Sequence, residues 1–397
     1  MRLPVLILLC LLSFCITAPL FSAGEINLQA LERDGEGRVA IFVESSDPAI
    51  KTLARRVFSL HGGYASAPAV SAAFQIQLER ASDRSVLLTV GSGQPYVEQL
   101  RQTLPGRDLQ DAVLRACDLV VEATLQSPGF FAGKLAFVAK KREISEIYTS
   151  DLLFNRVTPL TRDRALVTGP KWSPDGQSIV YTTYFKTGFP DVYRIDCGTG
   201  RREPIATYRG TNTGASFSPD GRRLAMSLSG TGNSEIYVSD NRGKDLQRLT
   251  SNKSLETSPS WSPDGRRLVY TSDAPGKPQL YEISANGGPA RRLPTNISSY
   301  CSEPVWNPVD DSLIAFTASV SGGFQIALYN AKTRSSKILT QGGSSLEPVW
   351  MRDGRHLIFT RREGGHTGLM LLDSVTGQER ALHKSGLGSL SSASFVY

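Results

Sequence analysis

The sequence predicts a β-propeller of six blades, because one short phrase recurs along the chain at a nearly constant interval. Three copies read aromatic-Ser-Pro-Asp-Gly, and each copy separates two stretches with the alternation of half-buried strands. The recurring aromatic positions are 45, 44, 45, 44 and 45 residues apart; they are Trp172, Phe217, Trp261, Trp306, Trp350 and Phe395. A period in the forties with several short strands per unit is typical of propeller blades.

Each Ser-Pro-Asp-Gly phrase is interpreted as a tight turn between the first two strands of a blade. Proline presets the φ angle of the second turn position, Ser and Asp hydrogen-bond nearby backbone, and Gly takes the left-handed conformation. The three copies occupy residues 173–176, 218–221 and 262–265. Because the phrase repeats in successive blades, its Asp residues are predicted to be structural and not to bind metal or transfer protons.

The two ends of the repeat region indicate how the ring closes. Residues 134–161 have the pattern of the second, third and fourth strands of a blade, whereas residues 393–397 have the pattern of a first strand with nothing after it. The last strand is therefore expected to complete the first blade, and the 264 residues from 134 to 397 then give 44 per blade. The predicted fold is mainly β, with a six-bladed propeller closed by the C-terminal strand and preceded by a small α/β domain.

The residues before the propeller are predicted to form three segments. Residues 1–23 have the features of a secretory signal peptide, with Arg2 ahead of an apolar run that is too short to span a bilayer. Residues 24–35 are expected to be an exposed tail, and residues 36–128 a small α/β domain. Its strands are expected near 38–43, 74–78 and 86–90, and its helices at 48–60 and 109–125. No further stretch is apolar enough to span a membrane, so the mature chain is expected to be exported and soluble. It is also expected to be a monomer.

The cysteine content and the charge distribution narrow the range of disulfides and partners that the protein can have. Three cysteines remain after signal removal, and we expect all three thiols to be unpaired, with Cys117 buried in a helix. Cys197 is predicted in the turn between the third and fourth strands of its blade. Cys301 is predicted in a connection between blades on the opposite side of the propeller, too far from Cys197 for a disulfide. The net charge is +7, but the Arg pairs are distributed around the ring, whereas a nucleic-acid protein gathers them on one surface. No nucleic-acid partner is therefore predicted.

Motifs of catalysis and cofactor binding are missing from the sequence. The four histidines stand in no HExxH spacing, the cysteines form no zinc pattern, and neither a GxSxG elbow nor a phosphate-binding loop is present. We therefore predict no catalytic residue, no cofactor and no metal site, and a protein that is not an enzyme.

The repeated phrases and the order of the parts resemble the TolB family. The resemblance rests on the Trp-Ser-Pro-Asp-Gly repeats, on the entry into the first blade at residues 129–138, and on the sequence of signal peptide, tail, α/β domain and closed propeller. It implies a periplasmic protein of the Tol-Pal envelope system that binds the peptidoglycan-associated lipoprotein Pal through its propeller and the inner-membrane protein TolA through its N-terminal tail. It also implies a role in outer-membrane integrity and cell division.

The resemblance and the predicted topology together suggest a partner surface. Connections from the fourth strand of one blade to the first strand of the next are expected on one face, around the central channel. Residues of these connections that match the family pattern, or repeat its Glu-Pro step, are Asn212, Thr213, Thr257, Ser258, Glu303 and Glu347. In the tail, Ile26 and Leu28 alternate with polar residues, as in a segment that adds to the edge of another sheet.

Two other functions are compatible with the sequence. A generic exported propeller scaffold would bind a different envelope protein. A calcium-dependent propeller hydrolase, such as a lactonase, would need several oxygen ligands that converge in the channel. Glu303 and Glu347 are the only evident carboxylate pair for such a site.

Overall fold

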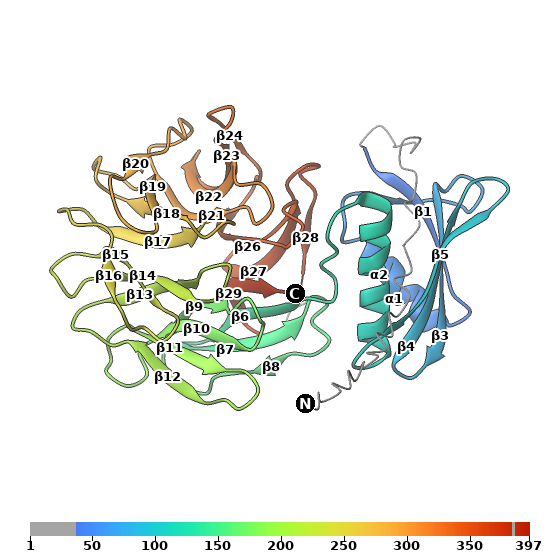
Figure 1. Cartoon of the computed structure of the whole chain (residues 1–397), viewed down its shortest axis with the longest axis horizontal. Coiled ribbons are helices and arrows are strands. Elements are labelled where there is room, and N and C mark those ends of the chain that lie inside the picture. The colour runs from blue at the N-terminus through green and yellow to red at the C-terminus, as the bar shows by residue number, and fades with distance from the viewer. Residues whose placement is uncertain (1–36, 383–385) are drawn as a thin grey trace, which may run out of the picture.

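The chain forms a ring of four-stranded sheets with a smaller α/β unit docked at its side (Figure 1). This arrangement comes from a computed structural model that describes residues 37–382 and 386–397. The predicted signal peptide and tail, including Ile26 and Leu28, lie outside the described residues.

The α/β unit is a five-stranded sheet covered on one side by two helices. Its strand order is β2-β1-β3-β4-β5. The elements are β1 (Val39–Glu44), α1 (Pro48–Phe58), β2 (Tyr64–Ser66), β3 (Phe74–Ser82), β4 (Ser85–Ser92), β5 (Val97–Pro105) and α2 (Leu109–Leu125). Both helices lie between the sheet and the propeller (Figure 1).

Local sequence explains both helices. Asp47 caps α1 by accepting a hydrogen bond from the backbone N–H of Ala49 at 2.9 Å, and Asp108 caps α2 in the same way from Asp111 at 2.9 Å. The predicted helices are confirmed. Strands β2 and β5 were not predicted, because β2 has only three residues and β5 is an edge strand that is largely exposed and lacks clean alternation.

Six sheets of four strands form the propeller, and each of the first five follows the chain order. The first two blades are β9 (Val167–Trp172), β10 (Ser178–Thr183), β11 (Asp191–Asp196) and β12 (Arg202–Ala206), then β13 (Asn212–Phe217), β14 (Arg223–Leu228), β15 (Glu235–Asp240) and β16 (Gln247–Arg248). The third is β17 (Glu256–Trp261), β18 (Arg267–Ser272), β19 (Gln279–Ser284) and β20 (Arg291–Arg292).

The remaining blades show the predicted closure. The fourth and fifth are β21 (Cys301–Trp306), β22 (Leu313–Val320), β23 (Gly323–Asn330) and β24 (Ser335–Ile338), then β25 (Ser344–Trp350), β26 (His356–Glu363), β27 (His366–Asp373) and β28 (Glu379–Ala381). The sixth has the order β29-β6-β7-β8, from β29 (Ser389–Val396), β6 (Lys134–Lys141), β7 (Ile144–Asp151) and β8 (Thr158–Pro159). The last strand of the chain therefore completes the blade that begins at residue 134, as the sequence predicted.

The Ser-Pro-Asp-Gly phrases form the expected turns between first and second strands. In the second copy, the Ser218 hydroxyl donates to Asp220 Oδ1 at 2.5 Å and accepts from the Arg223 N–H at 3.0 Å. The same Asp220 oxygen also accepts from the Arg222 N–H at 3.1 Å. The other two copies repeat these contacts at Ser173 and Ser262. These Asp side chains are therefore structural, as predicted.

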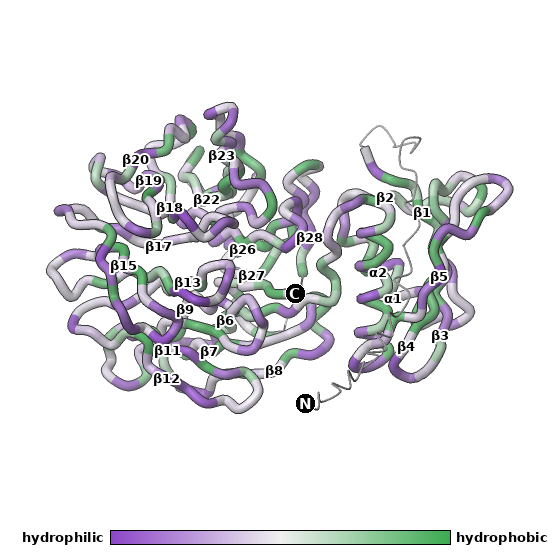
Figure 2. The backbone as a smooth tube through the Cα atoms, in the orientation of Figure 1, coloured by the Kyte–Doolittle hydropathy of each residue, from purple (hydrophilic) through white to green (hydrophobic). Residues whose placement is uncertain are grey.

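Antiparallel blades give the propeller two distinct faces. The face with the Ser-Pro-Asp-Gly turns and the turns between third and fourth strands is called the turn face. The opposite face, called the loop face, carries the hairpins between second and third strands and the connections from each fourth strand to the next first strand. Hydrophobic residues concentrate in the strands, and polar residues in the turns and loops (Figure 2).

The α/β unit docks on the turn face at the fifth and sixth blades. One continuous apolar core joins the two parts and includes buried Phe58 of α1, Phe130 and Phe131 of the joining segment, Ile358 of β26 and Leu390 of β29. Polar contacts surround this core; for example, Arg352 Nη2 pairs with Glu122 Oε1 at 3.3 Å. A shared core of this kind couples the stability of the two parts.

All three described cysteines are free thiols, as predicted, and Cys117 is buried in α2. The prediction that Cys301 lies in a connection between blades is wrong. Cys301 is the buried first residue of β21, because the first strands begin further from the recurring aromatic than the alternation suggested.

Candidate partner-binding site

The six predicted site residues of the propeller lie in the inner strands and not in loops. Asn212 and Thr213 begin β13, Thr257 and Ser258 belong to β17, and Glu303 belongs to β21. Glu347 belongs to β25, the corresponding inner strand of the fifth blade. The prediction of exposed connections is therefore wrong at these positions. Pro and polar residues suggested loops, but each inner strand accommodates them at a β-bulge.

Asn212 has a structural role. Its side chain is fully buried, and its amide donates to Tyr208 O at 2.8 Å and to Pro190 O at 3.2 Å. It also lies 3.2 Å from Asp191 Oδ1. Asn212 therefore holds the connection before β13 against the hairpin between β10 and β11. Any effect of Asn212 on a partner would act through those two loops.

The bulges place one residue of each blade on the wall of the central channel in the left-handed conformation. The φ values lie between 51° and 66° at all six positions, which are Gly169, Gly214, Ser258, Glu303, Glu347 and Ser392. They repeat at the same intervals as the aromatic residues. Glu and Ser adopt this conformation rarely, so hydrogen bonds must offset its energetic cost.

The two channel carboxylates are held by such bonds. Glu303 Oε2 accepts from Thr317 Oγ1 at 2.7 Å and from the Glu347 N–H at 2.9 Å. Glu347 Oε2 in turn accepts from Thr360 Oγ1 at 2.7 Å and from the Ser392 N–H at 2.8 Å. Each carboxylate thus joins its blade to the next one. A calcium-dependent enzyme would use the same two groups as ligands, but here three of their four oxygens already accept hydrogen bonds from the scaffold.

Lys171 adds a cation to the same channel. Burial is the main influence on Lys171 and lowers its pKa, while the nearby Glu347 and Glu303 carboxylates act in the opposite direction. Burial raises the pKa of Glu303, and the Glu347 charge adds to that effect. An ammonium group in this space opposes the binding of a divalent cation by charge repulsion. The arrangement therefore does not favour the calcium-dependent hydrolase.

The loop face carries a set of exposed apolar side chains that no sequence pattern predicts. Phe189 is 67% exposed, Leu255 51%, and Phe185 and Tyr208 each 45%. The full set lies in hairpins and connections of the sixth, first, second and third blades: Ile144, Leu166, Phe185, Phe189, Tyr208 and Leu255. We call this set the apolar rim. Large apolar side chains gathered on one face are typical of a protein-binding surface.

Backbone and ring contacts connect the loops of the apolar rim. The Tyr184 N–H donates to Leu166 O at 3.1 Å, which ties the hairpin before Phe185 to the connection that precedes β9. The Arg202 guanidinium lies 5.5 Å from the ring centre of Phe185. Together with the Asn212 contacts, these bonds position the rim before any partner binds, which reduces the ordering cost of association.

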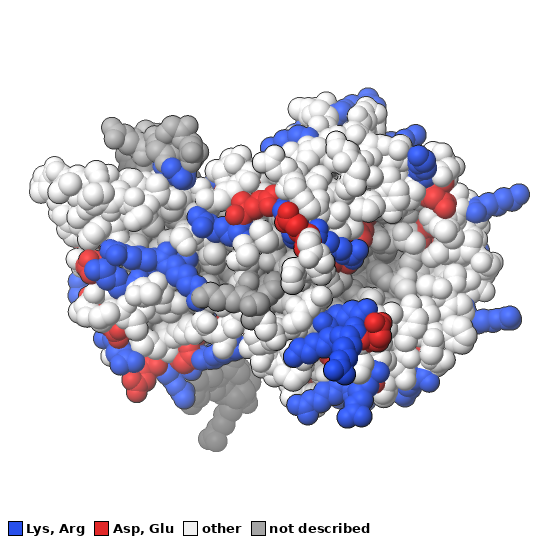
Figure 3. All heavy atoms as spheres, turned by 180° about the vertical axis from the view of Figure 1, so that it is seen from behind, with Lys and Arg blue, Asp and Glu red and all other residues white. Residues whose placement is uncertain are grey.

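Charge is mixed around these loops. A cleft on the loop face between the fifth and sixth blades is lined by Lys140, Lys141, Arg142 and Arg361, with Glu363 beside them. In the view from behind, Lys and Arg side chains form several separate groups with Asp and Glu among them (Figure 3). The surface in that view shows no continuous basic strip of the kind that nucleic acid requires.

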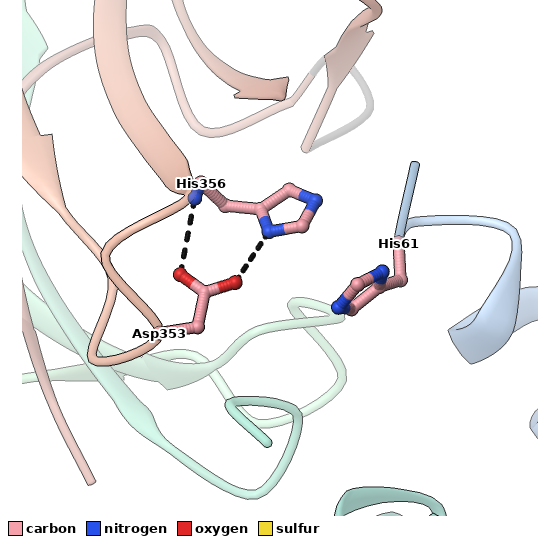
Figure 4. Close-up of side chains that lie close together, drawn as sticks. All are labelled: His61, Asp353 and His356. Atoms are coloured by element: carbon pink, nitrogen blue, oxygen red, sulfur yellow. Dashed lines mark hydrogen bonds and ion pairs between the residues drawn. The ribbon is translucent and has the colours of Figure 1, made fainter. Parts of the chain in front are cut away.

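A buried histidine pair lies where the α/β unit meets the propeller (Figure 4). His61, Asp353 and His356 each offer a metal-ligand atom within 4.8 Å of the others. However, the Gly63 N–H donates to His61 Nδ1 at 3.0 Å, and the Gly62 N–H donates to His356 Nε2 at 3.3 Å. His356 Nδ1 faces Asp353 Oδ2 at 2.6 Å. Backbone donors therefore already use one ring nitrogen of each histidine.

These hydrogen bonds favour a structural role for the histidine pair, as a contact between the two domains, over a role as a metal centre. Neutral His61 carries its proton on Nε2, because Nδ1 accepts a hydrogen bond, and a protonated nitrogen is not a ligand. Burial is the main cause that lowers the pKa of His61 well below its usual value, with His356 adding to it. No sequence pattern indicates this contact, since the two histidines come from distant segments of the chain.

The ring of six blades with an α/β unit docked on its turn face defines a two-domain propeller protein. The sequence profile described as the TolB beta propeller domain matches residues 121–395. This match covers more than half of the chain, so the chain belongs to the TolB family.

Individual relatives agree with this assignment. The Tol-Pal system protein TolB of Gluconobacter oxydans is 34% identical over 323 residues, which cover 77% of this chain and 68% of that protein. The TolB of Desulfosudis oleivorans is 32% identical over 143 residues, and the match spans 32% of that protein's length and 36% of this chain. The chain is thus similar to proteins named as TolB of the Tol-Pal system.

A solved structure shows the same fold. The crystal structure of TolB from Acinetobacter baumannii superposes with a TM-score of 0.82 at 23% identity, and covers 90% of this chain and 96% of that chain. Within the described residues, neither helix has the length and hydropathy that crossing a membrane requires.

Proposed function

We propose that this chain is a non-catalytic periplasmic adaptor of the Tol-Pal system that binds a Pal-like peptidoglycan-associated lipoprotein through the loop face of its propeller. In this role it supports outer-membrane integrity and cell division. Membership of the TolB family supports a role in the Tol-Pal system. The apolar rim supports the loop face as the surface that binds the partner.

The observation that carries the proposal is the exposure of Phe189, Tyr208 and Leu255 on a face that the α/β unit leaves free. Aromatic and aliphatic side chains dominate the binding energy of protein interfaces when a partner covers them. Thr213 and Thr257 are half-buried next to the start of their inner strands, below the rim. They are proposed to contact a partner segment that reaches towards the channel mouth, with Ser258, Glu303 and Glu347 deeper in the wall.

We also propose that Ile26 and Leu28 of the tail bind a TolA-like inner-membrane protein by adding a strand to one of its sheets. The alternating sequence of the tail supports this second contact. Two contacts on separate parts of one chain would allow it to connect the two membranes of the envelope.

The proposal is tested by recovering partners from an envelope extract with the mature protein and with a triple variant, Phe189→Ser, Tyr208→Ser and Leu255→Ser. We expect the wild type to recover a peptidoglycan-associated lipoprotein. We expect the triple variant to retain less than about a tenth of it, because buried interface anchors each contribute about 2 kcal/mol or more.

The matched control carries Val309→Ser and Val375→Ser, which remove apolar side chains that are 60% and 68% exposed on the turn face. It is expected to recover as much lipoprotein as the wild type. If the wild type recovers no lipoprotein, the adaptor proposal fails. If the triple variant recovers as much as the wild type, the lipoprotein binds through another surface.

A further inference from the structure

The central channel contains a cavity that the proposed lipoprotein contact does not use fully. Its volume is about 520 Å³, and inner strands from all the blades line it. Proteins bind small molecules in cavities of roughly 300–1,000 Å³. Tryptophan and proline side chains form much of the wall, among them Trp261, Trp306, Pro259 and Pro304. Charged groups in such a wall interact more strongly than they do in water.

Three charged side chains line this cavity: Lys171, Glu303 and Glu347. Lys171 belongs to the first blade and Glu303 to the fourth, so they stand on opposite sides of a six-membered ring. The Lys171 ammonium forms no hydrogen bond and no ion pair with any residue in 37–382 or 386–397. The cation and the carboxylates therefore face a common space without neutralising one another directly.

The two carboxylates are fixed in place more firmly than a solvated surface pair. Glu303 and Glu347 both have left-handed φ angles, of 53° and 55°, at positions where the first two blades have glycine. The hydroxyl groups of Thr317 and Thr360 hold their Oε2 atoms. Strained residues that are held in this way at a cavity wall indicate a site for a ligand. Glu303 Oε1 has no hydrogen-bond partner in the described part of the chain, so it is free to accept one from a ligand.

From this geometry we infer that the channel binds an amino acid with a cationic side chain, either free or as a residue of a short peptide. The side-chain ammonium of the ligand and its α-ammonium, or the N-terminal ammonium of the peptide, would lie at Glu303 and Glu347, and its carboxylate or a peptide carbonyl at Lys171. Two carboxylates and one ammonium on the wall are matched by two ammonium groups and one carboxylate on the ligand. This site is separate from the apolar rim and goes beyond the proposed function.

The inference is tested by calorimetric titration of the whole mature protein with lysine, with glycyl-lysyl-glycine and with 1,5-diaminopentane, which is lysine without its carboxylate. We expect lysine or the tripeptide to bind. Tighter binding of lysine would indicate a free amino acid as the ligand, and tighter binding of the tripeptide would indicate a residue of a peptide. Lys171→Met should weaken that ligand about tenfold, because it removes a charge-assisted contact. The same variant should bind 1,5-diaminopentane at least as tightly as the wild type does, because the Lys171 ammonium that repels the ammonium groups of this probe has been removed.

Two further variants complete the test. Glu347→Gln should weaken lysine and 1,5-diaminopentane alike. Lys277→Met, which removes an exposed cation from a hairpin of the third blade, should change neither. The inference is overturned if neither lysine nor the tripeptide binds, or if Lys171→Met weakens all three probes equally, which would indicate general damage to the channel. The probes include no lipoprotein, so failure here and failure of the adaptor proposal are distinguishable.

Discussion

Deleting residues 389–397 is expected to abolish the cooperative folding of the propeller. These residues supply the innermost strand of the sixth blade and pair with β6 from Ser389–Lys140 to Val396–Lys134. They also bring Leu390 into the core that the propeller shares with the α/β unit. Without the strand the ring stays open, β6 becomes an exposed edge, and apolar residues of two domains lose their cover. Thermal denaturation followed by circular dichroism should show no cooperative transition.

Two companion proteins separate the effect of the strand from that of chain length. Replacing the nine residues by a glycine-serine sequence of equal length should fail to fold in the same way. Leu390→Ala should fold, but with an unfolding free energy lowered by about 2–5 kcal/mol, the usual range for a buried leucine. A truncated protein that unfolds at the wild-type temperature would show that the ring does not depend on its closing strand.

Asp118→Asn is expected to change how stability depends on pH. Asp118 is 2% exposed on α2 and accepts hydrogen bonds from the N–H groups of Phe131 at 2.6 Å and Ala132 at 2.9 Å. Burial raises its pKa to about 7, although these bonds act in the other direction. The carboxyl therefore takes up a proton on folding at any pH between its ordinary pKa and about 7.

The sign of the effect follows from this proton uptake. As pH rises from about 4 to about 7, the unfolded chain loses its proton from Asp118 while the folded chain retains it, so wild-type stability falls. The difference between the two pKa values corresponds to about 4 kcal/mol. Above about pH 7 the contribution is constant. Asparagine does not titrate, so the variant should gain about 4 kcal/mol relative to the wild type across that range.

Urea denaturation at a series of pH values measures this difference. Other groups, such as His61, contribute equally to both proteins and cancel in the comparison. The contribution of His61 has the opposite sign, since its pKa is lowered and its stabilisation is lost as pH falls below about 6.5. A difference between variant and wild type that does not change with pH would contradict the account of Asp118.

The sequence predicted the propeller because its information is local and repeated. One turn phrase sets the hairpin between the first and second strands in three of the blades, and the unpaired strand patterns at residues 134 and 397 require closure. The α/β helices were predicted for the same reason, from a cap and an apolar stripe within one segment. Strand β5 escaped prediction because an exposed edge strand needs neither alternation nor strong apolar content.

The candidate site was less predictable because it depends on geometry that no single segment encodes. The sequence predicts Glu303 and Glu347 around the channel, where they lie, but it predicts loops at positions that form strands, since a β-bulge leaves no clear pattern in the sequence. The apolar rim comes from loops of different blades, and its residues share one face only in the closed ring. The contact between His61 and His356 joins the two domains and is visible only in three dimensions.

The central claim, that the loop face is the partner surface, is tested most directly by hydrogen–deuterium exchange of the mature protein with and without the soluble domain of the peptidoglycan-associated lipoprotein. We predict that bound lipoprotein slows exchange in the loops at residues 184–190, 207–211 and 251–255. Exchange in the Ser-Pro-Asp-Gly turns at 173–176 and 218–221 should not change. Protection confined to the turns, or no protection at a saturating concentration of the lipoprotein domain, would contradict the claim.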